Sequence, residues 1–210
     1  MSSQAIIELH YFPSLPYIAS WVYYDEVIIE SKENYTKQSF RNRCQIRSAN
    51  KVEDLIVPIR KGNSNIPIQE VRIDNRQSWL KNHWRAIQSA YGKAPFFDHY
   101  AEDIQKILSG MPRFLFDLNL EILEYILTIL EINKKIIFTQ KYEKEYPAES
   151  HDLRSAIHPK QALDTLFFYN SPRYIQVFGN QFVSNLSIID LIFCEGPNAI
   201  RIIKKSVGFL

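Results

Sequence analysis

The N-terminal segment constrains the fold most strongly, because residues 5–30 pass from a strand pattern to a helix pattern and back. The apolar run Ala5–Leu9 predicts a first strand, and Pro13 then interrupts regular structure. Apolar side chains at helical spacing predict a short helix from Pro16 to about Tyr24, and Val27–Glu30 predicts a second strand. Two strands joined through a helix form a βαβ unit, usually parallel and right-handed. The opening of the chain therefore predicts an α/β fold.

The ligand-binding rim of such a sheet lies beyond the carboxyl ends of its strands. We therefore expect His10, Tyr11 and residues 31–39 on that rim. A histidine at this position can act as an acid or a base near neutral pH. Alternatively, His10 and Tyr11 pack beneath the proline-rich turn, and the sequence leaves both interpretations open.

A basic segment, residues 35–47, alternates as a β-strand does. One parity holds polar and basic side chains: Arg41, Arg43, Gln45 and Arg47. The other parity is mostly apolar: Phe40, Asn42, Cys44 and Ile46. Guanidinium groups two residues apart on a strand project about 6–7 Å apart, a spacing that suits a phosphate or carboxylate ligand. The segment predicts either an anion-binding strand face or a solvated surface face.

Patterns further along the chain predict an antiparallel extension followed by helices. The expected strands are Asp54–Arg60, Ile66–Asp74, Lys135–Thr139 and Arg173–Phe178. The expected helices run from a capping box at Asp74 and Gln77 to Tyr91, over Phe97–Leu108, over Leu115–Ile132, from Pro159 through Phe167, from Ser187 to Gly196, and over Asn198–Ser206. The charged stretch Gln140–His151 predicts a flexible surface loop that could serve as a lid.

Together these elements predict a mainly parallel sheet opened by a βαβ unit, an antiparallel β extension and a helical middle segment. We expect one domain over residues 1–210, with a helical subdomain at about 75–132. The formal net charge of +2 argues against a nucleic-acid-binding protein, which normally shows a basic excess.

Composition also predicts the compartment. Cys44 and Cys194 are the only cysteines and make no disulfide framework. No secretory signal follows Met1, and the apolar stretch Leu115–Ile132 carries acidic residues that argue against a membrane span. We therefore expect a cytoplasmic protein. Its oligomeric state is left open.

Short motifs assign neither a metal nor a cofactor. No two His or Cys residues fall at metal-ligand spacing, and the glycine-rich phosphate loops are absent.

Asp190 has three interpretations: a catalytic carboxylate, a helix-capping group beside Ser187, or a brace for an arginine of the basic segment. Cys44 points away from the arginines on the strand pattern, which argues against a nucleophilic thiol. Arg154 is a candidate for a further anion contact.

Four stretches resemble the WbqC-like protein family. The signature stretch reads Tyr35-Thr36-Lys37-Gln38-Ser39-Phe40-Arg41-Asn42-Arg43. The others are His10–Tyr17, the stretch from Trp79 to Phe97, and Asn185–Phe193 with Gly196. They occur in the order of the family and span nearly the whole chain. Many relatives begin the first motif with Gln-Pro where His10-Tyr11 stands here, so a role of that glutamine does not carry over to His10.

The resemblance implies a setting, since members are associated with bacterial surface-polysaccharide (O-antigen) gene clusters without a firmly established activity. Our leading hypothesis is a transferase of polysaccharide biosynthesis that acts on a phosphorylated or nucleotide-linked donor, such as a nucleotide sugar. The expected substrate-binding residues are Tyr11, Tyr35, Lys37, Arg41, Asn42, Arg43 and Ser187. The cations would bind the anionic group and the tyrosines would stack on a ring, while His10 or Asp190 would carry the proton.

The alternative hypothesis is a non-catalytic interaction protein of a glycan-assembly complex. The arrangement of three segments, residues 10–17, 35–43 and 187–190, separates the two hypotheses. If these segments line one cleft, a ligand site is favoured, whereas their scatter favours an interaction protein.

Overall fold

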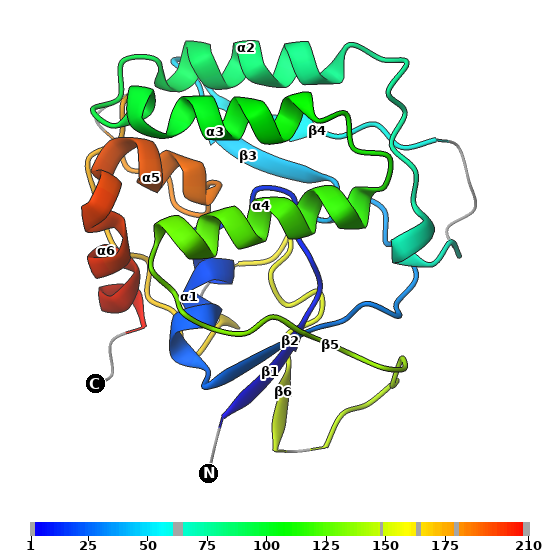
Figure 1. The fold of residues 1–210 in the computed structure, drawn as a ribbon. Helices are drawn as coiled ribbons and strands as arrows, with labels where there is room; N and C mark the ends of the chain where they lie inside the picture. The colour runs from blue at the N-terminus through cyan, green and yellow to red at the C-terminus, as the bar shows by residue number, and fades with distance from the viewer. Residues whose placement is uncertain (1–2, 61–64, 148, 163–164, 179–180, 208–210) are drawn as a thin grey trace.

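The computed structural model describes residues 3–60, 65–147, 149–162, 165–178 and 181–207 (Figure 1). The strands are β1 (Gln4–Ile7), β2 (Glu26–Ile29), β3 (Arg43–Arg47), β4 (Val52–Ile56), β5 (Ile137–Phe138) and β6 (Ser150–Asp152). The α-helices are α1 (Leu15–Tyr23), α2 (Trp79–Tyr91), α3 (Phe97–Ser109), α4 (Leu115–Ile129), α5 (Ile188–Glu195) and α6 (Ala199–Ser206). The described residues also form the 3₁₀ helices η1 (Ile68–Glu70) and η3 (Gly196–Asn198). The predicted α/β class is confirmed.

The parallel sheet has the strand order β5-β2-β1-β6. The predicted βαβ unit is confirmed, because β1 and β2 pair in parallel with Ile7 opposite Ile29, and α1 connects them. Strands β5 and β6 extend the sheet in parallel on its two sides. From β1 the chain adds β2 and then β5 on one side, and β6 later joins the other side of β1. The boundary between β1 and β6 is therefore a topological switch point. Ligands of open α/β sheets bind beyond the carboxyl ends of the strands at such a point.

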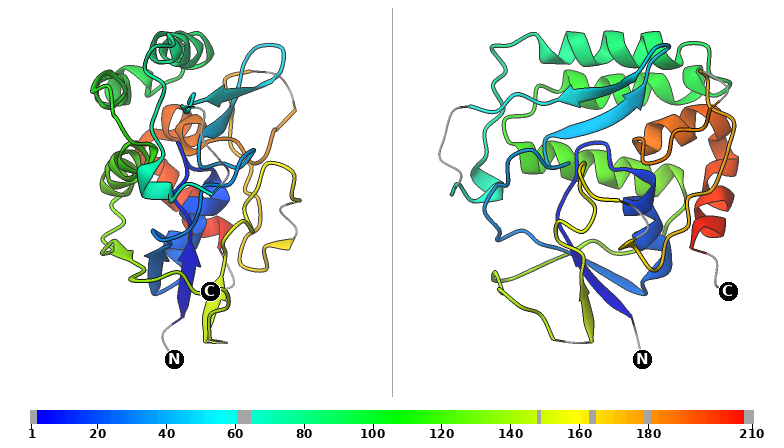
Figure 2. Two further views of the ribbon diagram at one scale, coloured as in Figure 1. Left: turned by 90° about the vertical axis from the view of Figure 1, so that its right-hand side faces the viewer. Right: turned by 180° about the vertical axis from the view of Figure 1, so that it is seen from behind.

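Strands β3 and β4 form the predicted antiparallel extension, with Arg43 opposite Ile56 and Arg47 opposite Val52. The predicted alternation holds within this hairpin, because Cys44 and Ile46 are buried while Arg43, Gln45 and Arg47 are half-buried. In Figures 1 and 2 the hairpin lies away from the parallel sheet and against the helical middle.

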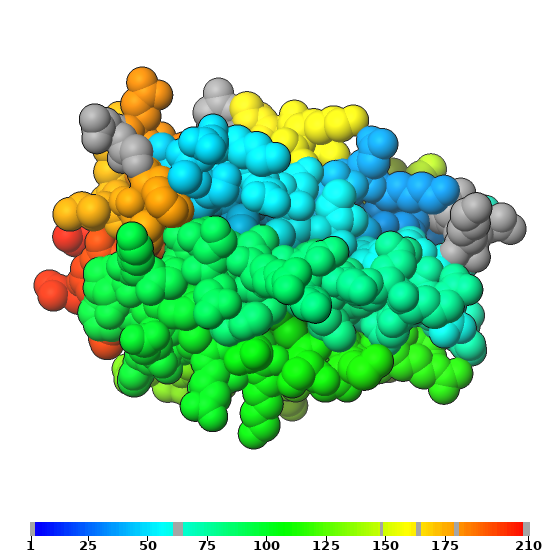
Figure 3. Space-filling view, turned by 90° about the horizontal axis from the view of Figure 1, so that it is seen from above, coloured from blue at the N-terminus to red at the C-terminus, as the bar shows by residue number. Residues whose placement is uncertain are grey.

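The helical middle segment is confirmed as helices α2, α3 and α4. Helix α4 buries a long apolar face that includes Leu118, Ile122 and Ile126, because its charged residues are confined to the opposite stripe; the buried polar residue Asn119 is hydrogen-bonded within the core. Figure 3 shows α2 and α3 in green as one continuous surface beside the cyan hairpin. In the described part of the chain, every helix is too short or too polar to cross a bilayer.

Three predicted elements are wrong, and a fourth is correct except at its end. Residues 66–74 form no strand: Pro67 precedes a 3₁₀ turn, and isolated bridges at Ile73 and Arg72 replace a ladder. Residues 173–178 are irregular as well, since the side-chain amide of Gln176 bonds both backbone polar groups of Val183 in place of a neighbouring strand. No α-helix forms in the described residues of 159–167, which adopt turns and bends with a 3₁₀ position at Thr165; residues 163 and 164 of the expected helix lie outside the described residues. The expected loop 140–151 ends in a strand, because β6 begins within it.

The start of α2 and the end of α5 each depend on particular nearby residues. The carboxylate of Asp74 pairs with the side chains of Arg76 and Gln77 instead of capping α2, which begins after Ser78, so the predicted capping box is wrong. Gly196 ends α5 at φ +52, and a Cβ atom there would lie 2.4 Å from the Phe96 ring. Only glycine fits this position.

Candidate functional site

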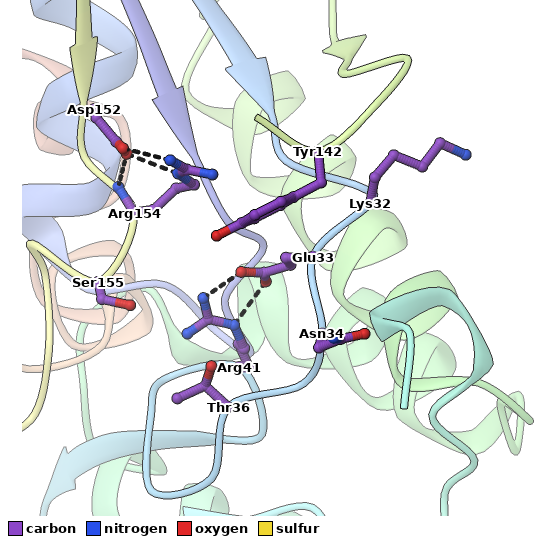
Figure 4. Close-up of a pocket in the computed structure, with 9 residues that line it drawn as sticks. All are labelled: Lys32, Glu33, Asn34, Thr36, Arg41, Tyr142, Asp152, Arg154 and Ser155. Carbon is purple, nitrogen blue, oxygen red and sulfur yellow. Dashed lines mark hydrogen bonds and ion pairs between the residues drawn. The ribbon is translucent and has the colours of Figure 1, made fainter. Parts of the chain in front are cut away.

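A cavity of about 600 Å³ opens at the carboxyl edge of the parallel sheet (Figure 4). Its lining comes from segments that follow three strands and from the start of the basic segment. The lining residues are Lys32, Glu33, Asn34, Thr36, Arg41, Tyr142, Asp152, Arg154 and Ser155. We call it the carboxyl-edge cavity. Its place at the switch point follows directly from the strand order.

Arg41 lies at the inner wall of the carboxyl-edge cavity and is only 1% exposed. Its Nε and Nη2 atoms donate to Oε1 and Oε2 of Glu33 at 2.7 and 2.6 Å. Its Nη1 atom lies 3.1 Å from Oε1 of Glu8, and Asn119 donates to its backbone carbonyl at 2.7 Å. The side chain is therefore held by two carboxylates, and the solvated reading of Arg41 is wrong.

Glu8 follows β1 and lies behind Arg41 in the core. Its two oxygens accept hydrogen bonds from the backbone N–H of Ser155 at 3.1 and 3.0 Å, and Nε2 of His10 lies 3.3 Å away. Burial by itself raises the pKa of Glu8, but Arg41 and His10 together lower that pKa to about 2. Burial lowers the pKa of His10 against the opposing effect of Glu8. Burial raises the pKa of Glu33, although Arg41 opposes the shift.

Arg154 forms a second ion-pair cluster at the end of β6. Its Nε and Nη2 atoms donate to Oδ1 and Oδ2 of Asp152 at 2.9 and 2.6 Å, and its Nη1 atom lies 3.4 Å from Oε2 of the fully buried Glu30. The guanidinium carbon stands 5.0 Å from the centre of the Tyr142 ring and 4.7 Å from that of Tyr146. Arg154 therefore ties β6 to the segment after β5.

That segment is the expected loop 140–151, and the structure gives it specific anchors. The hydroxyl of Tyr146 donates to Glu30 at 2.9 Å, and the backbone carbonyls of Glu143 and Lys144 accept from Arg154. Tyr142 itself is 52% exposed at the edge of the carboxyl-edge cavity. The segment covers part of the cavity wall, while its predicted mobility stays a prediction.

His10 and Tyr11 lie inside the core. His10 is buried against the rings of Tyr17 and Phe40, with ring centres 4.6 and 5.5 Å away. The hydroxyl of Tyr11 is hydrogen-bonded to Nδ1 of His83 at 2.8 Å. Both side chains therefore pack in the core, and His10 contacts Glu8, which in turn contacts Arg41 at the wall of the carboxyl-edge cavity.

The remaining residues of the basic segment diverge. Lys37 is exposed in a turn, and Tyr35 is buried. The side-chain amide of Asn42 donates to the backbone of Val57 at 2.9 Å. Arg43 points to the hairpin surface, where it lies 3.5 Å from Asp54. Because Arg41 precedes the strand, it does not share a face with Arg43, and of the expected substrate-binding residues only Arg41 lines the carboxyl-edge cavity.

Asp190 is buried away from this cavity. Its Oδ2 atom accepts from Tyr174 at 2.5 Å and from Gln176 at 3.1 Å, and burial raises its pKa. Arg47 donates to the same Gln176 at 3.0 Å. Asp190 therefore braces an arginine of the basic segment through Gln176. Ser187 caps α5, because its hydroxyl accepts from the backbone N–H of Ile189 at 3.4 Å.

The three segments that were expected to line one cleft do meet, but as packed core. The hydroxyl of Ser187 donates to the carbonyl of Phe12 at 2.9 Å, and its backbone N–H donates to Gln45 at 2.8 Å. The backbone N–H of Tyr11 donates to Phe40 at 2.9 Å. This junction fixes the position of Arg41, so these segments support the cavity from behind.

Sequence reasoning missed Glu33, Tyr142 and Asp152 as cavity residues, although it placed residues 31–39 on the rim and suggested Arg154 as an anion contact. One signal was available: acidic residues follow both strands of the βαβ unit, Glu8 after the first and Glu30 and Glu33 after the second. In a parallel sheet these positions converge at the carboxyl edge.

A second hollow of about 620 Å³ lies beside the end of α4 and is lined by Glu124, Leu127, Thr128 and residues 131–136. Both cysteines are free and buried, and burial raises the pKa of Cys44 well above its ordinary value. Within the described ranges, no group of three or more His, Cys, Asp or Glu side chains could hold a metal ion.

Comparisons with known proteins agree with the sequence resemblance. A family model described as "WbqC-like protein family" matches residues 9–165 and 160–202. A protein of Mycobacterium tuberculosis described as "Uncharacterized protein Rv1507c" is 28% identical over 233 aligned positions, which cover 98% of this chain and all of that protein. No solved structure matches the chain at a significant level.

Proposed function

Because this chain belongs to the WbqC-like protein family, we propose that it is a cytoplasmic enzyme of bacterial surface-polysaccharide biosynthesis. In this proposal it is a transferase, and its phosphorylated or nucleotide-linked sugar donor binds in the carboxyl-edge cavity. The observation that carries the proposal is the convergence of polar side chains from four segments into one cavity at the switch point of a parallel sheet.

The lining supplies groups that suit such a donor. Lys32 is exposed at the rim and can pair with a phosphate, while Tyr142 offers a ring face for stacking. Arg41 and Arg154 line the inner wall, where each guanidinium group holds a carboxylate of the lining in a fixed orientation. His10 acts in this proposal as a positioning residue, because it touches Glu8 and not the cavity.

The proposal is tested by blocking the cavity. A thermal-shift screen of nucleotide sugars first selects the tightest binder, and calorimetry then measures its Kd for the wild type and two variants. Thr36→Trp fills the carboxyl-edge cavity, and Thr128→Trp is the matched control in the second hollow, since both threonines are exposed.

We expect Thr36→Trp to weaken binding by at least about tenfold, a free-energy loss of about 1.4 kcal/mol, and Thr128→Trp to leave it unchanged. Equal weakening by both variants, or by Thr128→Trp alone, would place the ligand elsewhere. If no nucleotide sugar binds to the wild type, the interaction-protein alternative takes precedence.

A further inference from the structure

Two arginine–carboxylate pairs of the same geometry flank the carboxyl-edge cavity (Figure 4). One is Arg41 with Glu33, and the other is Arg154 with Asp152; in each, Nε and Nη2 donate to the two carboxylate oxygens at 2.6–2.9 Å. Figure 4 shows the pairs on different sides of the cavity, with the Tyr142 ring pointing into the space between them. Such two-bond contacts fix the plane and position of each carboxylate. The cavity therefore presents two oriented acceptor groups.

The charge around these pairs disfavours an anion deep in the cavity. Glu8 lies 3.1 Å from Nη1 of Arg41, and Glu30 lies 3.4 Å from Nη1 of Arg154. Each guanidinium thus stands between two carboxylates, so the inner wall carries an excess of negative charge. A phosphate or carboxylate pressed against it would meet like charges at a distance where their repulsion is strong. The ammonium group of Lys32, at the rim, contacts the side-chain carbonyl of Gln69 and no carboxylate among the described residues, although the backbone N–H of Lys32 donates to Glu30.

The same groups suit hydroxyls. A carboxylate has about four acceptor positions, and the arginine contacts leave part of them unused on Glu33 and Asp152. Tyr142, which is 52% exposed, adds an apolar face beside them. A sugar ring combines hydroxyl groups along its edge with an apolar face of C–H groups. The cavity also falls in the usual volume range of small-molecule sites.

We propose that the carboxyl-edge cavity binds a hydroxyl-rich, non-anionic sugar ring, with Glu33 and Asp152 accepting hydrogen bonds from its hydroxyl groups and Tyr142 packing on its face. The phosphate of the donor then stays outside, near Lys32. This inference rests on the proposed function, since it names the part of the donor that enters the cavity. It makes Asp152 a specificity-determining residue that separates neutral hexoses from uronic acids.

The test compares neutral and anionic sugars on the full chain. Saturation-transfer NMR measures binding of glucose, galactose, mannose and N-acetylglucosamine against glucuronate and galacturonate. Calorimetry measures UDP- and GDP-linked hexoses against UDP-glucuronate and the parent nucleoside diphosphates. The variants are Asp152→Asn and, as a second cavity variant, Tyr142→Ala. Asp54→Asn is the matched control, because Asp54 is also paired with an arginine and its side chain is 37% exposed, as is that of Asp152.

We expect at least one neutral hexose to bind while both uronates fail, and its nucleotide-linked form to bind about tenfold or more tightly than UDP-glucuronate and than its parent diphosphate. Asp152→Asn and Tyr142→Ala should each weaken binding of that hexose by about tenfold, and Asp54→Asn should not.

Each other outcome has a distinct meaning. If neutral hexoses bind but no nucleotide sugar does, the sugar-ring inference stands and the proposed donor is wrong. If nucleotide sugars bind no better than their parent diphosphates, or uronates bind as well as hexoses, the inference is overturned while donor binding stands. Unchanged binding by both cavity variants also overturns it, and the absence of any binding overturns both proposals.

Discussion

Replacement of Arg41 by methionine should strongly destabilise the protein, because it leaves Glu8 and Glu33 buried without their cation. Methionine roughly matches the length of the aliphatic stem but supplies no charge. The substitution removes two charge-assisted hydrogen bonds to Glu33 and the ion pair with Glu8. Breaking a buried ion pair by removing one partner costs about 3–5 kcal/mol.

The pKa of Glu8 gives an independent figure of the same order. Lowering that pKa from 4.5 to about 2 corresponds to about 3 kcal/mol of stabilisation of the ionised native state. Because the folded pKa is depressed, this stabilisation is complete above the unfolded pKa of 4.5 and is lost as the pH falls toward 2. In Arg41→Met the buried carboxylates prefer to be protonated, so the difference between wild type and variant should shrink at low pH.

The assay is urea unfolding followed by circular dichroism at a pH of about 7 and of about 4. Arg43→Met is the matched control, since Arg43 is partly exposed beside Asp54 and its loss should cost about 0–1 kcal/mol. A loss below about 1 kcal/mol for Arg41→Met at neutral pH, or a loss that does not depend on pH, would refute the assigned ion-pair cluster.

Three further predictions concern the framework, each measured by urea unfolding. Tyr11→Phe should lower the free energy of unfolding by about 1–3 kcal/mol, because it leaves Nδ1 of His83 buried without its partner; a loss below about 0.5 kcal/mol, the usual range for surface substitutions, would contradict this. Gly196→Ala should lower the free energy of unfolding by more than about 1 kcal/mol, because the backbone has φ +52 and the added methyl group clashes with Phe96. A stabilised variant would show that the conformation assigned to this helix end is wrong. Asp190→Asn should flatten the pH dependence: burial raises the pKa of Asp190, so wild-type stability falls relative to the variant as the pH rises above about 4, and parallel pH curves would argue against burial.

The sequence predicted those parts of the fold that rest on local periodicity. The apolar runs of the βαβ unit and the stripes of α2, α3 and α4 each determine an element without help from distant residues. The elements that failed depend on particular side-chain contacts that periodicity does not encode. The segment 173–178 has strand-like residues, but the Gln176 amide bonds Val183, and no pattern in the sequence shows that contact.

The candidate site shows the same division. The sequence placed residues 31–39 on the correct rim, because the direction of a βαβ unit follows from its pattern alone. It misread Arg41 as a strand-face residue, since the turn at Gln38 and the approach of Glu8 and Glu33 arise only in three dimensions. A basic side chain preceded by acidic residues at two strand ends is a pattern that predicts an internal ion pair.

Amide chemical-shift mapping with the tightest-binding nucleotide sugar tests most directly whether the carboxyl-edge cavity is the ligand site. The experiment uses the ¹⁵N-labelled wild-type chain and follows each assigned amide during the titration. We expect shifts at residues 32–36, at Tyr142 and at residues 152–155. Shifts confined to residues 131–136, beside the second hollow, would contradict it.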